Sequence, residues 1–371
     1  MDLAAVEKAF RDNFVERGEL GASLSIWQGG EEVLNLADGW CEREHQKEWT
    51  AATMVPFYSA TKALASATLL MLLEENGLGP EDLVCRVWAE FPNKNATFGE
   101  LLSHQCGLAA LDQKVSVFEY EAVIAAIEAQ EPNWDLGDGH GYHPRTFGFI
   151  VEEPVRLLSG KRLGEVFRER IAEPLGLELW IGLPESEFGR VATLYPGKTD
   201  KSDLESGFYK AFNQQGTLVR QAFSSPRGLQ GVHEMNTPKA WQSGLPAMGG
   251  VGTAQGLAQF YQAAIGVLPF FSDEVLEWMK TPLVTGDDRI LMTQTRFSCG
   301  FQLDPLDGAG KKVRHNYGSG MHAFGHPGAG GSHAFGDPDS GISYAYIMNQ
   351  MDLSVLPGAK SSAIIEALSE S

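Results

Sequence analysis

The chain has 371 residues, of which 43% are hydrophobic and 21% charged, and its 48 acidic and 29 basic residues give a net charge of -19. This composition is typical of a soluble globular protein with about two domains, or one large discontinuous domain, and it excludes a fibrous or disordered chain. The negative charge repels phosphate backbones and anionic membrane surfaces. We therefore expect no nucleic-acid partner and no membrane partner, and we interpret the dispersed acidic residues as a solubilising coat.

The cysteines and the first residues indicate the compartment. Four cysteines lie far apart, at Cys41, Cys85, Cys106 and Cys299. They form no Cys-x-x-Cys pair, which argues against a zinc site or a disulfide framework. Residues 1–8 lack the basic start and apolar core of a signal peptide, and no run of 18 apolar residues follows. We expect a cytoplasmic protein, provided that Met1 is the natural start.

The first third of the chain contains a predicted helix, a hairpin and a buried helix. Apolar residues recur at helical spacing between residues 3 and 14. Strand-like runs at 22–28 and 31–37 are joined by Gly29-Gly30, a two-residue link that suits a tight hairpin turn. Residues 62–76 are apolar nearly all round, which predicts a helix inside the protein rather than on its surface.

The middle of the chain is predicted to be largely helical. Helices are expected at 98–103, 117–130, 145–158 and 163–172. Between residues 184 and 246 periodicity is poor, and such a long irregular stretch is usually a lid or a binding loop. Its aromatic residues are candidates for a pocket wall: Phe188, Tyr195, Phe208, Tyr209, Phe212, Phe223 and Trp241.

Strands return near the end of the chain and indicate the fold class. Helices are expected at 254–265 and 273–279, strands at 322–326, 331–336 and 342–350, and a closing helix at 359–368. We predict an α+β fold, with an antiparallel sheet flanked by terminal helices plus an inserted mainly helical domain. Residues 1–60 and 245–371 would form the mixed domain, and residues 61–244 the helical one, with 184–246 covering the pocket.

The strongest candidate for chemistry is Ser59-x-x-Lys62, which opens the predicted buried helix. Side chains three apart on a helix share a face, so the Ser59 hydroxyl and the Lys62 amine can share a proton. Lys62 acts as a base only when it is neutral, and burial and the positive end of the helix both lower its pKa. No other lysine in the chain has a serine three places before it.

Two further segments can complete a site. Tyr142 lies just before a predicted helix, and by itself it would be interpreted as structural. The stretch from His326 to Gly331 is rich in small residues, which let a strand lie against a ligand. The N–H groups of Ala329 and Ser59 can form an oxyanion hole, in which each donor contributes about 2.7–4 kcal/mol to acyl transfer.

The order Ser59-x-x-Lys62, Tyr142 and His326-x-Gly328 resembles the serine beta-lactamase/penicillin-binding-protein-like superfamily, and among its members class C beta-lactamases and family VIII carboxylesterases most closely. The stretches at 101–108 and 249–254 are also similar to stretches of that superfamily, and the resemblance runs from about residue 15 to residue 350. It implies a beta-lactamase/transpeptidase-like fold.

The resemblance also implies roles for the residues. Ser59 would be the acylated nucleophile, Lys62 and Tyr142 the general-base pair, and the strand at 326–329, with His326, Gly328 and Ala329, one wall of the site beside the oxyanion hole. No cofactor and no metal are implied.

Two departures from class C beta-lactamases bear on the substrate. Their Tyr-x-Asn is replaced by Tyr142-His143-Pro144, which lacks the amide for an acylamino side chain. Their Lys-Thr-Gly is replaced by His326-Pro327-Gly328, which lacks a fixed cation and a hydroxyl for the substrate carboxylate. Both losses remove recognition of a beta-lactam or a D-peptide but keep the acyl-transfer groups, so a small-molecule ester with a short acyl chain is the favoured substrate.

Alternatives remain beside this reading. The enzyme could be a beta-lactamase or a D-amino-acid peptidase or amidase, and a catalytically silent relative could bind a ligand through the same cleft. The absence of Gly-x-Ser-x-Gly argues against an alpha/beta-hydrolase. His104 is interpreted as structural, and His143 could tune the pocket or be exposed. The histidines His315, His322, His326 and His333 lack the spacing of a helical zinc motif.

Overall fold

The computed structural model describes residues 1–198 and 206–369. Its centre is an eight-stranded antiparallel sheet in the order β2-β1-β11-β10-β9-β8-β7-β6. The strands are β1 (Gly21–Gln28), β2 (Glu31–Gly39), β6 (Val284–Asp287), β7 (Gln294–Phe297), β8 (Gln302–Leu303), β9 (Phe324–Pro327), β10 (His333–Asp337) and β11 (Ile342–Met348). The N-terminal hairpin thus pairs with strands from the other end of the chain, as the predicted α+β fold requires.

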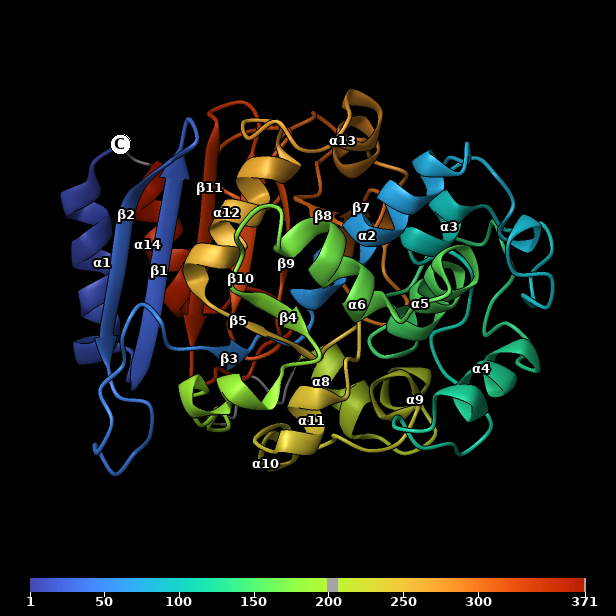
Figure 1. Cartoon of the computed structure of the whole chain (residues 1–371), viewed down its shortest axis with the longest axis horizontal. Coiled ribbons are helices and arrows are strands. Elements are labelled where there is room, and N and C mark those ends of the chain that lie inside the picture. Colours follow the sequence, from blue (N-terminus) through green and yellow to red (C-terminus); the bar gives the residue numbers. More distant parts are fainter. Residues whose placement is uncertain (199–205, 370–371) are drawn as a thin grey trace.

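Alternating side chains on β11 divide the sheet into two faces. Tyr346 packs its ring 6.3 Å from that of Phe10 on α1 (Leu3–Glu16), while Tyr344 shares a hydrogen bond with Ser361 on α14 (Ala359–Ser369). Ser343, one residue before Tyr344, donates to the Ala258 carbonyl of α12 (Ala254–Ala264) on the opposite face. In Figure 1, α12 crosses in front of the sheet and α14 lies behind it. The terminal helices therefore flank the sheet, as predicted, and α12 covers the other side.

Most of the remaining helices lie beside the half of the sheet that runs from β9 to β6, in the right half of Figure 1. They are α2 (Thr61–Glu75), α3 (Phe98–Leu102), α4 (Tyr120–Glu128), α5 (Thr146–Ser159), α6 (Leu163–Phe167), with the π-helical turn η2 (Arg168–Ala172), and α13 (Asp273–Lys280), together with the single 3-10 turn η1 (Val84–Arg86). Within the described residues, no helix combines the length and apolar character needed to cross a bilayer.

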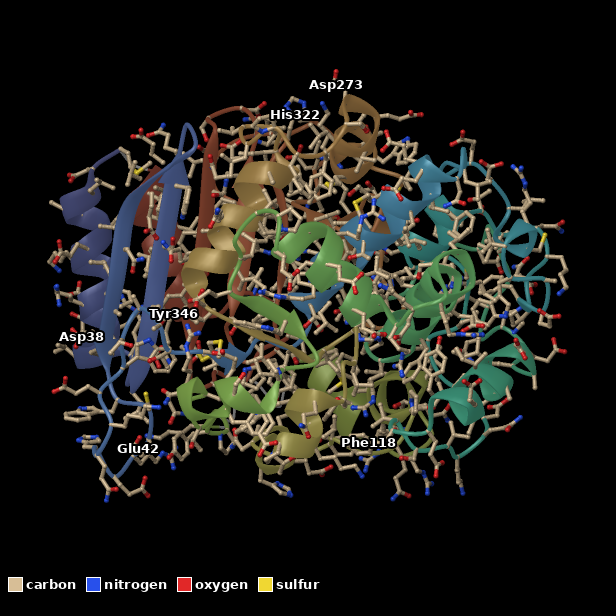
Figure 2. All side chains as sticks on the ribbon, in the orientation of Figure 1. Asp38, Glu42, Phe118, Asp273, His322 and Tyr346 are labelled. Atoms are coloured by element: carbon tan, nitrogen blue, oxygen red, sulfur yellow. The ribbon has the colours of Figure 1, made fainter. Side chains whose placement is uncertain are left out.

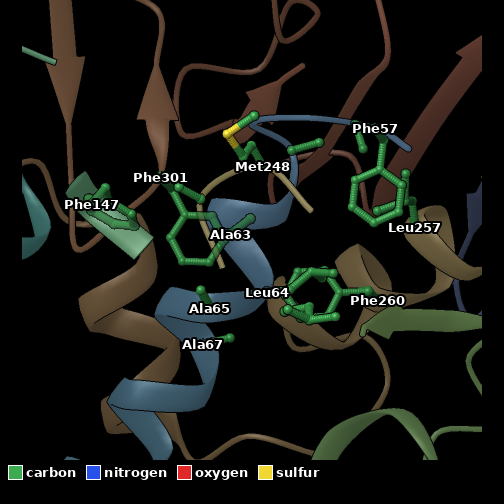
Figure 3. Close-up of a cluster of buried hydrophobic side chains, with 14 of the residues drawn as sticks. Phe57, Ala63, Leu64, Ala65, Ala67, Phe147, Met248, Leu257, Phe260 and Phe301 are labelled. Atoms are coloured by element: carbon green, nitrogen blue, oxygen red, sulfur yellow. The ribbon is translucent and has the colours of Figure 1, made fainter. Parts of the chain in front are cut away.

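Helix α2 is the centre of this packing. It contacts β9 as well as α5, α6 and α13, and nearly all of its side chains are buried. Figure 3 shows Leu64 of α2 beside Phe260, in a buried cluster that also holds Phe147 and Phe301 from other segments. The apolar run at 62–76 forms a helix because every face of it meets another element, as the sequence predicted.

The stretch at 184–246 differs from its prediction. It was expected to be irregular, but its described part holds η3 (Glu185–Arg190), α8 (Gly207–Asn213), α9 (Leu218–Ser224), α10 (Val232–Met235) and α11 (Pro238–Gln242). Each helix has seven residues or fewer, which is too short for a helical hydrophobic period to show in the sequence. Short strands were missed for the same reason: β6 to β8, and a second sheet of β3 (Val55–Pro56), β5 (Gly250–Gly252) and β4 (Leu179–Ile181).

Candidate active site

Ser59 lies in the turn between β3 and α2, and its side chain is half-buried. Backbone pairing holds this turn in place: the Phe57 N–H donates to the Gly250 carbonyl at 3.0 Å, and the Gly250 N–H donates to the Thr61 hydroxyl at 2.9 Å. Tyr58, immediately before Ser59, has a positive φ of 45°. Contacts with β5 and with the start of α2 thus fix the turn from both sides. The turn places Ser59 just before the N-terminal end of α2.

The Lys62 amine is fully buried and lies 3.1 Å from the Ser59 hydroxyl. It also donates to the carbonyls of Pro144 at 2.9 Å and Ala247 at 2.8 Å. In its neutral form this amine would have two N–H donors for the two carbonyls and one lone pair, which could then accept the Ser59 proton. Burial, and secondarily the charge of Arg145, hold the Lys62 pKa well below its usual value. The structure therefore brings the predicted nucleophile and base together, in surroundings that favour the neutral amine.

Tyr142 reaches the same point from the turn before α5. The Lys62 amine lies 4.9 Å from the centre of its ring. Burial raises the Tyr142 pKa, and a hydrogen bond with the Ser59 side chain opposes this only in part. The phenol is therefore protonated at neutral pH, which suits a group that relays a proton rather than one that removes it.

A buried carboxylate that the sequence did not point to fixes this tyrosine. The Tyr142 N–H donates to both Asp288 oxygens, at 3.0 and 3.1 Å. Asp288 also accepts from the N–H groups of Ile290 and Leu291 and from the Thr295 hydroxyl. Asp288 lies between β6 and β7, 146 residues after Tyr142, so no local spacing could have linked them.

The histidines beside the site are structural. The sequence allows His143 to be either a pocket residue or an exposed one, and the structure buries it completely. Its Nδ1 bonds the Gly141 carbonyl at 2.7 Å, and its Nε2 accepts from the Leu108 N–H at 2.9 Å. Burial lowers its pKa to about 3. His104, as expected, is buried too, and its Nδ1 accepts from the His143 N–H at 3.2 Å.

The end of β9 forms the opposite wall. A Cβ atom on Gly328 would lie 2.1 Å from the Phe57 carbonyl oxygen, so only glycine lets this backbone approach the Ser59 turn. Across the described ranges, the N–H groups of Ser59 and Ala329 donate to no other protein group. Two free backbone donors on adjoining segments can hold an oxyanion.

His326 points into the same site as a neutral group. It is 1% exposed, its ring centre lies 5.9 Å from that of Tyr142, and its Nδ1 bonds the Pro327 carbonyl at 2.8 Å. Burial, and secondarily the nearby Lys62, lower its pKa to about 3. Its Nε2 has no partner among the described residues, so this atom is left for a ligand or water.

The other C-terminal histidines lie apart from His326. His333 is one residue out of register with it on the neighbouring strand, so the two rings project from opposite faces of the sheet. His322 pairs with Asp339 at 2.8 Å on the surface, where Figure 2 labels it, and His315 is also exposed. These four residues do not converge on one point.

The aromatic residues of 184–246 divide into separate groups. Phe208 packs in the same apolar cluster as Tyr142, and Tyr209, Phe212 and Phe223 pack against that cluster. The Tyr209 hydroxyl donates to the Leu353 carbonyl at 2.9 Å, which ties α8 to the segment after β11. The rest lie elsewhere: Phe188 and Trp241 against β5, and Tyr195 under Arg43. The α8–α9 aromatics thus adjoin the site, and the other three do not.

Two large cavities of the described surface lie away from Ser59. Two cavities of about 600 and 680 Å³ open on the described surface. The first lies beside Trp180 and Arg168, and the second beside Arg43 and Lys360. Ser59 lines neither of them.

Comparison with known proteins agrees with this geometry. A profile of the beta-lactamase family matches residues 3–368. The crystal structure of a family VIII carboxylesterase superimposes with a TM-score of 0.85 and 30% identity, and a penicillin-binding protein homolog from Caulobacter crescentus with 0.83 and 32%; each comparison covers 98% of this chain and 96% of the other. The esterase/beta-lactamase LipL of Mycobacterium tuberculosis (strain ATCC 25618 / H37Rv) is 25% identical over 346 residues, which are 88% of this chain and 76% of that protein. The chain therefore belongs to the beta-lactamase family, within the serine hydrolases.

Proposed function

We propose that this enzyme hydrolyses carboxylic esters, with short acyl chains, through an acyl-enzyme on Ser59. The observation that carries the proposal is the contact of 3.1 Å between the Ser59 hydroxyl and a buried amine whose other two neighbours are carbonyls. Lys62 takes the hydroxyl proton as Ser59 Oγ attacks the ester carbon, and the N–H groups of Ser59 and Ala329 hold the negative oxygen.

Tyr142 completes the proton path. The tetrahedral intermediate collapses by breaking the bond to the alkoxide, which takes a proton from the Tyr142 phenol while Lys62 returns its own proton to the tyrosine. Water then attacks the acyl-enzyme with the same groups acting in reverse, and the carboxylic acid leaves. The raised pKa of Tyr142 supports this relay, because a protonated phenol can donate as soon as the leaving oxygen gains charge.

The electrostatics favour a neutral ester over a beta-lactam. His326 stands where a fixed cation would bind a substrate carboxylate, but its pKa of about 3 leaves it uncharged at neutral pH. His143 cannot supply the missing amide, because both of its ring nitrogens are already bonded to backbone groups. The family VIII carboxylesterase and LipL, named as an esterase/beta-lactamase, support ester cleavage, and the name of LipL keeps beta-lactam cleavage as the second candidate.

Three measurements on purified wild-type protein and Ser59→Ala separate the candidates. Turnover of p-nitrophenyl acetate or butyrate that the variant loses supports the proposal. Faster turnover of a chromogenic cephalosporin favours the second candidate. Failure of a serine-directed phosphonate to add its mass to Ser59, together with no turnover, points to a silent binding relative. The cytoplasmic location and the domain boundaries at 60/61 and 244/245 stay predictions.

A further inference from the structure

Arg145 is a buried cation that the reaction above does not use. Its side chain is 5% exposed. Its Nε donates to the Pro226 carbonyl at 2.9 Å, its Nη1 to that of Leu229 at 3.4 Å, and its Nη2 to that of Gly228. Within the described residues, no carboxylate lies within 4.0 Å of it. A buried charge without an ion-pair partner is expensive, which calls for a reason to keep it.

Its position in the chain suggests that reason. Arg145 follows Pro144, whose carbonyl accepts from the Lys62 amine, and it lies three residues after Tyr142. One short turn thus carries the phenol, a carbonyl acceptor of the base and the guanidinium. The same backbone segment therefore binds the Lys62 amine, through the Pro144 carbonyl, and carries Arg145.

The segment that Arg145 holds is under conformational restraint. Gly228 has φ of 105° and Leu229 has φ of 51°, in the left-handed region that leucine rarely adopts. The guanidinium fork binds three carbonyls of this loop at once, which a lysine ammonium cannot match in geometry. The loop joins α9 to α10, so the same contacts anchor the covering segment to the site.

We propose that Arg145 is a positioning residue of the hydrolytic site: its buried guanidinium fixes the 226–229 loop against the turn that carries Tyr142, and its unpaired charge, one residue along the chain from the Pro144 carbonyl that binds Lys62, disfavours a second positive charge on that amine. This inference rests on the proposed function.

The groups facing Lys62 agree with this assignment. From the packed elements these are Tyr142 and Arg145, together with the three histidines His104, His143 and His326, while Tyr58 interacts with Arg145. Burial lowers the pKa of each histidine and raises that of each tyrosine, so all five are uncharged at neutral pH. Burial lowers the Arg145 pKa, but only to about 10, because Glu234 and Tyr58 act to raise it. Arg145 therefore keeps its charge at neutral pH.

The test is the pH dependence of kcat/KM for the nitrophenyl ester in the full-length chain. Activity needs neutral Lys62 and rises with pH through its pKa. Arg145→Met removes the charge. We therefore expect the acidic limb of the profile, in which kcat/KM rises with pH, to shift to higher pH by about one to three units. Arg145→Lys keeps the charge but loses the fork, so the limb should stay within about half a unit while KM rises. Arg168→Met is the control, because Arg168 also donates to a carbonyl, that of Leu177, beside a cavity that Ser59 does not line.

An acidic limb that does not move in Arg145→Met overturns the electrostatic role, even if the melting temperature falls. An unchanged KM in Arg145→Lys overturns the positioning of the loop. Where Arg145→Met fails to fold, the rate of phosphonate labelling of Ser59 against pH in Arg145→Gln decides the same question. Wild-type protein that neither turns over ester nor reacts with the phosphonate overturns the proposed function, and this inference with it.

Discussion

Gly328→Ala tests whether the backbone of β9 completes the site. The added Cβ would lie 2.1 Å from the Phe57 carbonyl oxygen, whereas real Cβ atoms essentially never approach closer than 3.0 Å. Both partners are backbone, so no side chain can rotate away and the end of β9 must shift by roughly 1 Å. That shift separates the Ala329 N–H from the Ser59 N–H.

The expected loss of kcat can be estimated from the general effects of misplaced groups on enzyme catalysis. A misplacement of about 1 Å costs about a hundredfold, and loss of one oxyanion donor costs about a hundredfold to a thousandfold in kcat. We therefore expect Gly328→Ala to lower kcat for p-nitrophenyl acetate by about two to three orders of magnitude, with a smaller change in KM. We expect the contact between Lys62 and Ser59 to be kept, so the acidic limb of the pH profile should remain in place.

The assay needs a control and a clear contrary result. Gly308→Ala is matched, because a Cβ at Gly308 meets nothing within 4 Å and its φ is not positive. Circular dichroism and the melting temperature report whether each variant is folded. A folded Gly328→Ala that keeps kcat within threefold of wild type would refute the oxyanion role given to this strand.

Two further predictions follow from buried groups. Asp288→Asn replaces one of the two oxygens that accept from the Tyr142 N–H by an amide donor, so kcat should fall about tenfold to a hundredfold. Asp339→Asn, at an exposed position, serves as the control. Equal activity of the two variants would contradict the anchoring role of Asp288. Burial lowers the His333 pKa from 6.5 to about 3, so the unfolded chain binds a proton in that window that the folded one does not, and stability falls as pH decreases. His333→Asn should reduce the slope of the unfolding free energy by about 1.4 kcal/mol per pH unit between pH 3 and 6.5 in urea titrations, and an unchanged slope would contradict this.

Long or strongly patterned elements could be predicted from the sequence. The hairpin of β1 and β2 forms because Gly29 and Gly30 adopt φ of 62° and 88°, which few other residues tolerate in succession. The sequence predicted both ends of α2 to within one residue. Its apolar run is longer than any strand of the described chain, so the run could be assigned to a helix. The short helices α8 to α11 and the strands β6 to β8 were missed, because such segments are stabilised by their neighbours and leave little local pattern.

The sequence by itself determined that a hydroxyl and an amine would meet, because three residues at a helix start bring Ser59 and Lys62 within reach whatever surrounds them. Only the tertiary structure decided that the surroundings of the amine lower its pKa. The Pro144 and Ala247 carbonyls that bind it lie 82 and 185 residues away along the chain, and Asp288 meets Tyr142 across 146 residues. Spacing is a local property of the backbone, whereas burial, charge and hydrogen-bond partners depend on segments that meet only when the whole chain has folded.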